Sequence, residues 1–213
     1  MLSKQVAQRM NRVVAQQQVR QFSLWSFMEA APPDPIFKVN DAFKQDKNPK
    51  KQLLGVGAYR DDNNKPYILD SVIEAEKRIM NMDHEYAGID GIQSFRENAL
   101  KLAYGPSHVA LQGKRVASCQ SLSGTGSLRL GLDFLRDWYP NKNAKVFVAD
   151  PTWPTHRGIA ERAGWEHKSY RYYDKSKKAF DLNGMLEDLD KADDEQIILL
   201  HMCAHNPTGC DPS

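Results

Sequence analysis

The sequence has few cysteines, no long hydrophobic run and almost no net charge, and each shortage excludes a class of protein. Three cysteines in 213 residues, Cys119, Cys203 and Cys210, are too few for a disulfide framework and suit a reducing intracellular compartment. No apolar stretch approaches the roughly 20 residues that a membrane-spanning helix needs. The formal net charge of +2 provides no electrostatic footprint for nucleic acid. We therefore expect neither a membrane nor a nucleic acid as a partner.

Acidic residues are missing from the first 28 positions, and Glu29 is the first carboxylate. The basic residues of this segment are Lys4, Arg9, Arg12 and Arg20. In a helix its hydrophobic residues would share one face. A basic, amphipathic, acid-free leader is typical of a mitochondrial transit peptide. Residues 1–22 are therefore predicted to direct the protein to the mitochondrial matrix, with cleavage near Phe22. The alternative is a solvated or partner-binding N-terminal helix.

Beyond residue 115 the hydrophobic pattern alternates between short apolar runs and helical stripes. The runs predict strands at 116–122, 146–149, 168–173 and 197–202. The stripes predict helices at 124–138, 155–163 and 181–191. The first of these helices is expected to turn four residues inward: Leu128, Leu132, Leu135 and Trp138. Such alternation indicates an α/β fold with a mainly parallel sheet and helices on its faces.

Three further helices are predicted before this region. A short apolar stripe spans 36–43, and a longer one spans 71–82 with Ser71 as its N-cap. A third helix covers 92–102 and is expected to end at Gly105, because glycine followed by proline does not continue a helix.

A candidate binding residue follows the last apolar run. The run at 197–200 leads into Asn206-Pro207-Thr208-Gly209, a sequence that breaks a strand. Ligands of open α/β sheets gather at the carboxyl ends of the strands, so Asn206 is placed to meet a ligand. The alternative is a turn in which Asn206 bonds only the local backbone.

Two more motifs follow predicted strands. Ser123-Gly124-Thr125 opens a helix, where free N–H groups and the helix dipole suit a phosphate, although such residues also cap helices that bind nothing. Trp153 follows the strand at 146–149 and offers a flat face for an aromatic ring. Its alternative role is a half-buried anchor in the first turn of a helix.

A metal site is a rival interpretation of the last segment. His201, Cys203 and His205 alternate, so they would share one face of an extended strand, with Cys210 nearby. The spacing lacks the Cys-x-x-Cys knuckle that is typical of zinc sites.

Six stretches, in order along the chain, resemble one family. The most specific is HMCAHNPTGCDP at 201–212, which is similar to the signature of the aspartate aminotransferases, fold-type I enzymes that depend on pyridoxal 5'-phosphate (PLP). The other five are PPDPIFKVNDAFKQD at 32–46, LLGVGAYRDDNNKPY at 53–67, SLSGTGSLRLG at 121–131, PTWPTH at 151–156 and YRYYD at 170–174. The sequence from about residue 29 onward is thereby identified as a member of this family, of the mitochondrial type.

The resemblance implies how the cofactor is held. Ser123, Gly124 and Thr125 would bind the phosphate of the cofactor in their own subunit. Tyr86 would reach the cofactor phosphate of the partner subunit. Trp153 would stack on the pyridine ring.

The resemblance also implies substrate contacts and supporting residues. Asn206 would bond the 3-oxygen of the cofactor and, with Trp153 and the backbone of Gly57, the substrate carboxylate. His156 and His201 would support the acidic partner of the pyridinium nitrogen. The peptide bonds at 150–151 and 206–207 would be cis.

The family pattern further implies a division of the chain. Residues 1–22 would be the leader, 23–60 the N-terminal arm and part of the small domain, and 61–213 the N-terminal part of the PLP-binding large domain. Nothing in the sequence matches the family's Schiff-base lysine, the aspartate for the pyridinium nitrogen or the arginines that clamp a dicarboxylate.

Two interpretations therefore remain. In one, the chain is the N-terminal part of a homodimeric enzyme with shared active sites, which exchanges an amino group between aspartate and 2-oxoglutarate, with glutamate and oxaloacetate as the other pair. In the other, it is a catalytically inactive fragment that binds phosphate compounds or dimerises.

Overall fold

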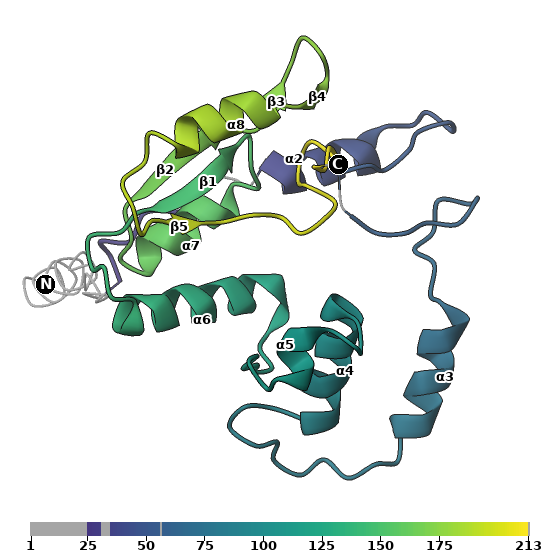
Figure 1. The fold of residues 1–213 in the computed structure, drawn as a ribbon. Helices are drawn as coiled ribbons and strands as arrows, with labels where there is room; N and C mark the ends of the chain where they lie inside the picture. Colours follow the sequence, from purple (N-terminus) through teal and green to yellow (C-terminus); the bar gives the residue numbers. More distant parts are fainter. Residues whose placement is uncertain (1–24, 31–34, 56, 213) are drawn as a thin grey trace, which may run out of the picture. The chain divides into compact units, whose positions relative to one another are not determined.

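The computed structural model describes residues 25–30, 35–55 and 57–212, and the chain divides into two units, Met1–Asp83 and His84–Ser213 (Figure 1). The predicted transit peptide lies outside the described residues. Among the described residues, no helix has the length and apolar character needed to cross a bilayer.

The first unit contains α2 (Pro35–Gln45) and α3 (Asp70–Ile79), which confirms two predicted helices. The end of α2 is held by Lys51, whose Nζ donates to the carbonyl oxygens of Phe43 and Asp46 at 2.7 Å each. The prediction that Ser71 caps α3 is wrong, because the helix already includes Asp70 and no side chain caps it. The carboxylate of Asp70 instead lies in the first turn, where the helix dipole favours negative charge.

The second unit begins with α4 (Gln93–Tyr104) and α5 (Val109–Gln112). As predicted, α4 ends at Gly105, which adopts φ +82° and donates its N–H to the carbonyl of Lys101. A positive φ of this kind is available to glycine at little cost.

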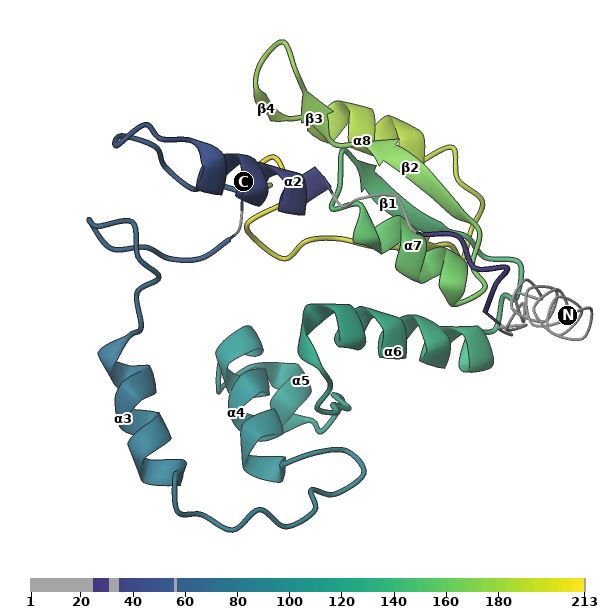
Figure 2. The same cartoon turned by 180° about the vertical axis from the view of Figure 1, so that it is seen from behind.

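A three-stranded parallel sheet forms the centre of the second unit, in the order β2–β1–β5. Its strands are β1 (Val146–Asp150), β2 (His167–Arg171) and β5 (Ile197–Ile198). The helices around it are α6 (Ser123–Trp138), α7 (Thr155–Arg162) and α8 (Leu182–Leu189), and a small hairpin joins β3 (Tyr173–Asp174) to β4 (Ala179–Phe180). Helices α6 and α7 lie on one face and α8 on the other (Figures 1 and 2). The predicted α/β fold is confirmed for this part of the chain.

Alternating residues of β1 build two cores, one on each face of the sheet. Val146 and Val148 face α6 and α7 and join one buried cluster, whereas Phe147 and Ala149 join the other, beside α8. All four are at most 7% exposed. Successive side chains of a strand point to opposite faces, so an uninterrupted apolar run is what a strand covered on both faces requires.

Three details of the predicted pattern are wrong. Segment 116–122 is not a strand; the N–H of Gln120 bonds the Asp90 carbonyl instead, and a strand needs a neighbour to satisfy its polar backbone. β5 ends at Ile198, four residues before the predicted boundary. Trp138 is 74% exposed rather than turned inward. At about 100° per residue it lies roughly 120° from Leu132, outside the apolar stripe.

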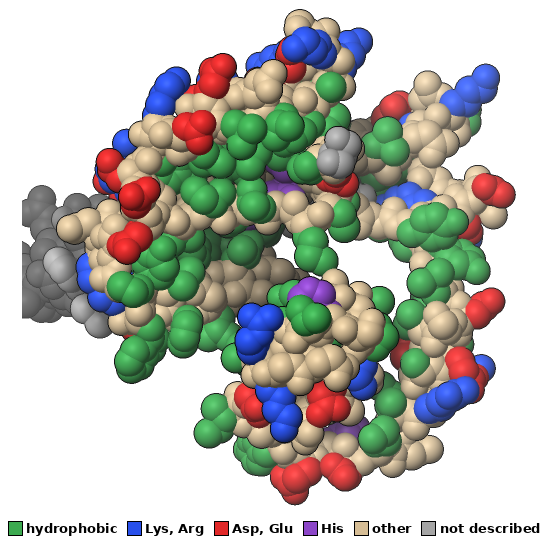
Figure 3. All heavy atoms as spheres, viewed as in Figure 1, with side chains coloured by type: hydrophobic (Ala, Val, Ile, Leu, Met, Phe, Trp, Pro, Cys, Tyr) green, Lys and Arg blue, Asp and Glu red, His purple; other side chains and the backbone are tan. Residues whose placement is uncertain are grey.

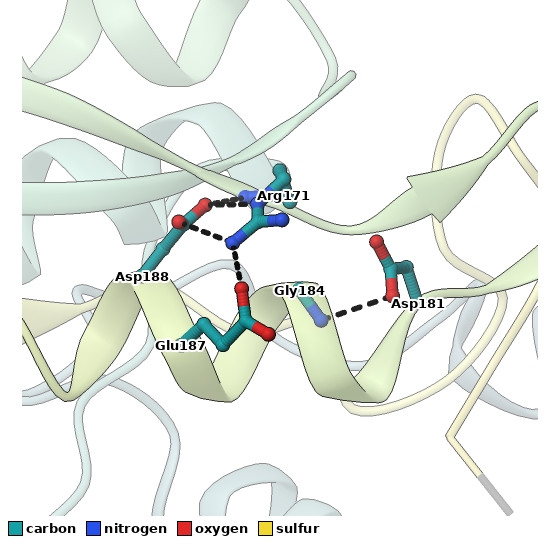
Figure 4. A network of polar contacts seen from close by, with 5 residues as sticks. All are labelled: Arg171, Asp181, Gly184, Glu187 and Asp188. Carbon is teal, nitrogen blue, oxygen red and sulfur yellow. Dashed lines mark hydrogen bonds and ion pairs between the residues drawn. The ribbon is translucent and has the colours of Figure 1, made fainter.

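Helix α8 is tied to the end of β2 by an arginine network (Figure 4). The guanidinium of Arg171 donates to both oxygens of Asp188 at 3.0 and 2.8 Å and to Glu187 at 2.7 Å. This pairing lowers the pKa of Asp188 to about 2, since hydrogen bonds from the guanidinium favour the ionised carboxylate. At the other end of the helix, Asp181 caps the N–H of Gly184 at 2.9 Å.

Candidate functional site

Five aromatic side chains form a continuous row at the carboxyl ends of the three parallel strands. Trp153 follows β1, His156 is in the first turn of α7, His201 and His205 follow β5, and Tyr172 follows β2. Their ring centroids are 5.3 Å apart for Trp153–His156, 4.9 Å for His156–His201, 4.3 Å for His201–His205 and 3.7 Å for His205–Tyr172. The row occupies the edge of the sheet where ligands of open α/β folds bind.

The hydrogen bonds of the histidines leave two buried ring nitrogens without a partner among the described residues. Nδ1 of His201 accepts the backbone N–H of Asn206 at 3.1 Å, so the neutral ring carries its proton on Nε2. Nδ1 of His205 lies 2.8 Å from the Thr208 hydroxyl. The Nε2 atoms of both rings are buried and unpaired. A buried polar atom of this kind normally has a partner, which identifies the two atoms as points where a ligand or another side chain can bond.

Burial keeps the three imidazoles neutral. It lowers the pKa of His156 to about 4, with repulsion from His201 and His205 adding to the effect. The pKa values of His201 and His205 are also lowered, mainly by burial. His156 Nδ1 is 2.8 Å from the hydroxyl of Thr152, which fixes its ring. At neutral pH the row therefore offers hydrogen-bonding groups without adding positive charge.

The loop that carries Asn206 is held by Asp211. Its carboxylate accepts the backbone N–H groups of Ala204 at 2.7 Å and His205 at 2.8 Å. These two bonds lower the pKa of Asp211 and keep it ionised. Tyr172 adds a bond from its hydroxyl to the Cys210 carbonyl at 2.8 Å. The loop thus has a fixed backbone, while the Asn206 side chain faces solvent.

The loop also contains two unusual backbone features. Ala204 adopts φ +55°, which is uncommon for a residue with a side chain. The Asn206–Pro207 peptide bond is cis, as is Asp150–Pro151, which confirms both expectations from the family pattern.

The second candidate segment is the start of α6. Ser123 adopts φ +58°, and no side chain caps the helix. A Cβ atom on Gly124 would meet nothing within 4 Å, so the backbone is open to a close approach at this point. The first-turn N–H groups therefore remain available to an anion. The hydroxyl of Ser127 donates to the Ser123 carbonyl at 2.9 Å and stabilises the turn.

Not all residues predicted for the site belong to the row. Contacts join Trp153, His156, His201 and the backbone of Asn206. The remaining predicted residues are Ser123, Gly124 and Thr125 at the start of α6, Tyr86 in the segment before α4, and Gly57 in the first unit. Tyr86 is 96% exposed.

Sequence reasoning missed three residues that build the site. Tyr172 and Asp211 were given no role, and His205 was considered only as a zinc ligand. The signals were present, because His205 borders Asn206 and Asp211 follows the same turn. Among the described residues, no group of three His, Cys, Asp or Glu side chains could hold a metal ion.

Comparisons with known proteins place the chain in one family. The sequence profile of the family "Aminotransferase class I and II" matches residues 49–213. The chain is 48% identical over 204 residues to the mitochondrial aspartate aminotransferase of Schizosaccharomyces pombe. The aligned region covers 95% of this chain and 46% of that protein. It therefore spans about half the length of this relative.

Solved structures give the same result. Aspartate aminotransferase from Saccharomyces cerevisiae cytoplasm has a TM-score of 0.81 and 44% identity, over 89% of this chain and 46% of that one. An aromatic-amino-acid aminotransferase from Burkholderia pseudomallei, covalently bound to pyridoxal phosphate, has a TM-score of 0.83 and 40% identity, over 90% and 48% of the respective chains.

Proposed function

The chain belongs to the aminotransferase class I and II family, and on this premise we propose that it forms the cofactor-binding part of an aspartate aminotransferase. The proposed reaction is reversible transfer of an amino group between L-aspartate and 2-oxoglutarate, which yields oxaloacetate and glutamate. Aspartate is favoured over aromatic substrates because the identity to the S. pombe aspartate enzyme is 48%, against 40% for the aromatic aminotransferase.

One observation carries the proposal: the backbone of Asn206 is bonded to His201 in the same row of rings that contains Trp153. A flat aromatic face, neutral imidazoles and an exposed amide side chain therefore lie at one edge of a parallel sheet. These are the groups that a flat, polar heteroaromatic cofactor requires.

Pyridoxal 5'-phosphate fits the residues present. The uncapped start of α6, with Ser123, Gly124 and Thr125, suits the phosphate. The indole of Trp153 suits the pyridine ring. The unpaired Nε2 of His201 is a buried donor that can support a polar group beside that ring. When bound, the cofactor supplies the electron sink for amino-group transfer.

The chain's own residues would bind and orient the cofactor and the substrate. Asn206 would donate from its amide to the 3-oxygen and to the substrate carboxylate, and Gly57 would offer its backbone to that carboxylate. His156 and His201, being neutral, would position an acidic group without competing with it for charge. Asp211 and Tyr172 would keep Asn206 in place through the loop backbone.

A second candidate function is cofactor or phosphate binding without turnover. It concerns the given 213 residues by themselves, in which no lysine matches the family's Schiff-base motif. A positioned acid–base group usually contributes about 10²–10⁴-fold to a rate. We expect the 213 residues alone to bind phosphate compounds weakly and not to transaminate.

We also propose a homodimer in the mitochondrial matrix. Tyr86 would reach the cofactor phosphate of the partner subunit, and its exposure of 96% is consistent with that role. The acid-free leader and the mitochondrial relative support the location, although a relative from yeast cytoplasm is also similar. A fluorescent reporter fused to residues 1–28 should enter mitochondria and be trimmed near Phe22; a reporter that stays cytosolic and intact would contradict this location.

The reaction is tested by a chimera in which this chain replaces the matched half of the S. pombe enzyme. We expect turnover of aspartate, and a loss of at least tenfold in Asn206→Ala and in Trp153→Ala. Leu130→Ala, at an exposed position of α6, is the control and should keep full activity. Unchanged turnover in Asn206→Ala would overturn its assigned role. A folded chimera that does not turn over aspartate would overturn the proposed reaction.

A further inference from the structure

Strand β2 lies at an edge of the sheet, where it pairs only with β1 among the described residues. The N–H of Val146 donates to the carbonyl of Glu166, the residue before β2, at 2.9 Å. Backbone groups of a strand alternate between its two sides, so the even-numbered residues of β2 also face β1. The backbone groups of His167, Ser169 and Arg171 therefore face the outer edge. Such an edge is a template on which a strand of another chain can pair.

The side chain of Arg171 passes from one face of the sheet to the other. Tyr170 joins the buried cluster beside α8, whereas the Ser169 hydroxyl accepts a bond from Arg157 of α7 at 3.3 Å. Successive side chains of a strand point to opposite faces, so the Arg171 side chain starts on the α7 face, like that of Ser169. Its guanidinium nevertheless bonds Asp188 of α8, which lies on the opposite face (Figure 4).

The carboxylate of Asp188 fixes the place of this crossing. Its Oδ2 accepts both the backbone N–H of Arg171 at 2.9 Å and the Nε of the same residue at 3.0 Å. Because that N–H faces outward, the carboxylate and the guanidinium lie over the outer edge of β2. Glu187 accepts a further bond from the guanidinium at 2.7 Å. We call Arg171, Glu187 and Asp188 the edge strap.

The edge strap covers one of three outward-facing positions and leaves the others open. Strand β2 has five residues, an ordinary length for a strand, so pairing along all of it would give a complete ladder. Ser169 is exposed and lines a cavity of about 320 Å³ beside the strand. The strap itself faces solvent, and Figure 3 shows charged side chains of both signs over α8. It is therefore placed to interrupt a ladder that would otherwise run to the end of β2.

We propose that Arg171 and Asp188 prevent β2 of one molecule from pairing with β2 of a second copy. A second copy is the occupant that fits best, because two identical edges can meet antiparallel across a two-fold axis and offer each other the same groups. The proposal concerns association between molecules and does not depend on the proposed reaction.

The test uses the chimera with the S. pombe half and three variants of it. Arg171→Ala combined with Asp188→Ala removes the strap. Lys145→Ala is the matched control, because it breaks an ion pair with Glu166 at 2.6 Å that joins the starts of β1 and β2 without covering the outer edge. Ser169→Pro, added to the strap variant, removes an outward N–H, and proline is tolerated at that kind of position in an edge strand.

Sedimentation velocity over a range of concentrations measures the association. We expect the strap variant to self-associate at concentrations at least tenfold lower than the unsubstituted chimera, and Lys145→Ala to behave like that chimera. Adding Ser169→Pro should restore the original sedimentation without restoring the stability of the strap variant in urea.

Hydrogen exchange tests the geometry of the edge in the unsubstituted chimera. The amide of Arg171 should be protected and that of Ser169 should exchange fast, because only the first has an acceptor in Asp188. Asp188→Ala should accelerate exchange at Arg171 and leave Ser169 unchanged.

Four outcomes would overturn the proposal. Unchanged sedimentation of the strap variant is the first. Equal association in Lys145→Ala is the second, and association that persists after Ser169→Pro is the third, because a general loss of stability would then be the cause. The fourth is equal protection of the Ser169 and Arg171 amides, which would show that the open part of the edge is already covered.

Discussion

The imidazole of His205 lies nearly parallel to the phenol ring of Tyr172, with centroids 3.7 Å apart and planes inclined by 13°. The two residues are 2% exposed each and connect the end of β2 to the loop after β5. The loop that carries Asn206 is therefore supported by the sheet. Its geometry depends on contacts between distant parts of the sequence, which leads to the following predictions.

The hydroxyl of Tyr172 should stabilise the loop separately from its ring. Tyr172→Phe keeps the stack but removes the bond to the Cys210 carbonyl, and we expect a loss of about 0.5–1.5 kcal/mol in the free energy of unfolding. Tyr172→Leu also removes the stack and should cost more. Urea denaturation measures both. Equal stability of the wild type and Tyr172→Phe would show that the bond contributes nothing.

Asp211 should control the loop through its charge. Asp211→Asn replaces one acceptor oxygen with a donor that faces a backbone N–H, so hydrogen exchange at Ala204 and His205 should accelerate. Because the pKa of Asp211 is lowered in the folded chain, its contribution is present above the ordinary aspartate pKa and is lost as pH falls through the folded value. Protection of these two amides should decrease below about pH 4 in the wild type. Equal protection of these two amides in the wild type and in Asp211→Asn would show that the Asp211 carboxylate does not hold the loop.

The histidine row should make stability depend on pH. The pKa of His156 is about 4 in the folded chain, against 6.5 when exposed, so the unfolded chain binds more protons between these values. The free energy of unfolding should therefore fall as pH decreases from about 6.5 to about 4. His156→Phe should reduce that slope. An NMR titration that gives His156 a pKa of 6.5 or higher would contradict the burial argument.

Among the apolar residues of α6, the buried Leu132 should contribute more to stability than the exposed Leu130. The Leu132 side chain is 6% exposed, so Leu132→Ala should lower the free energy of unfolding by about 2–5 kcal/mol through the cavity it leaves. The backbone carbonyl of Leu132 accepts the indole N–H of Trp165 at 3.0 Å. Leu130→Ala, at 45% exposure on the same helix, should change stability by about 0.5 kcal/mol or less. Urea denaturation measures the loss of stability in both variants. Similar losses in the two would show that Leu132 does not contribute to the core in the way its burial predicts.

Elements whose apolar residues recur at a regular spacing could be predicted from the sequence. Helices α6, α7 and α8 and strand β1 were predictable because their apolar residues recur with the period of one element. The stacking of His205 on Tyr172 was not, since no spacing encodes a contact between residues 33 positions apart.

The errors have physical causes as well. Segment 116–122 has a strand-like composition but no partner strand among the described residues, and a strand requires one. Ser123 and Ala204 adopt left-handed conformations that neither residue type prefers, so the residue types alone could not predict them. Both residues lie in the candidate binding segments.

The most direct test of the site is an NMR titration of the isotope-labelled chain with pyridoxine 5'-phosphate. This probe has the ring and phosphate of the cofactor but no aldehyde, so it cannot react with lysines. We expect the largest shifts at the indole N–H of Trp153, the ring of His201 and the amides of Gly124 and Thr125, and at least tenfold weaker binding of pyridoxine, which has no phosphate. Shifts confined to other residues, or equal affinity for the two compounds, would contradict the proposed cofactor site.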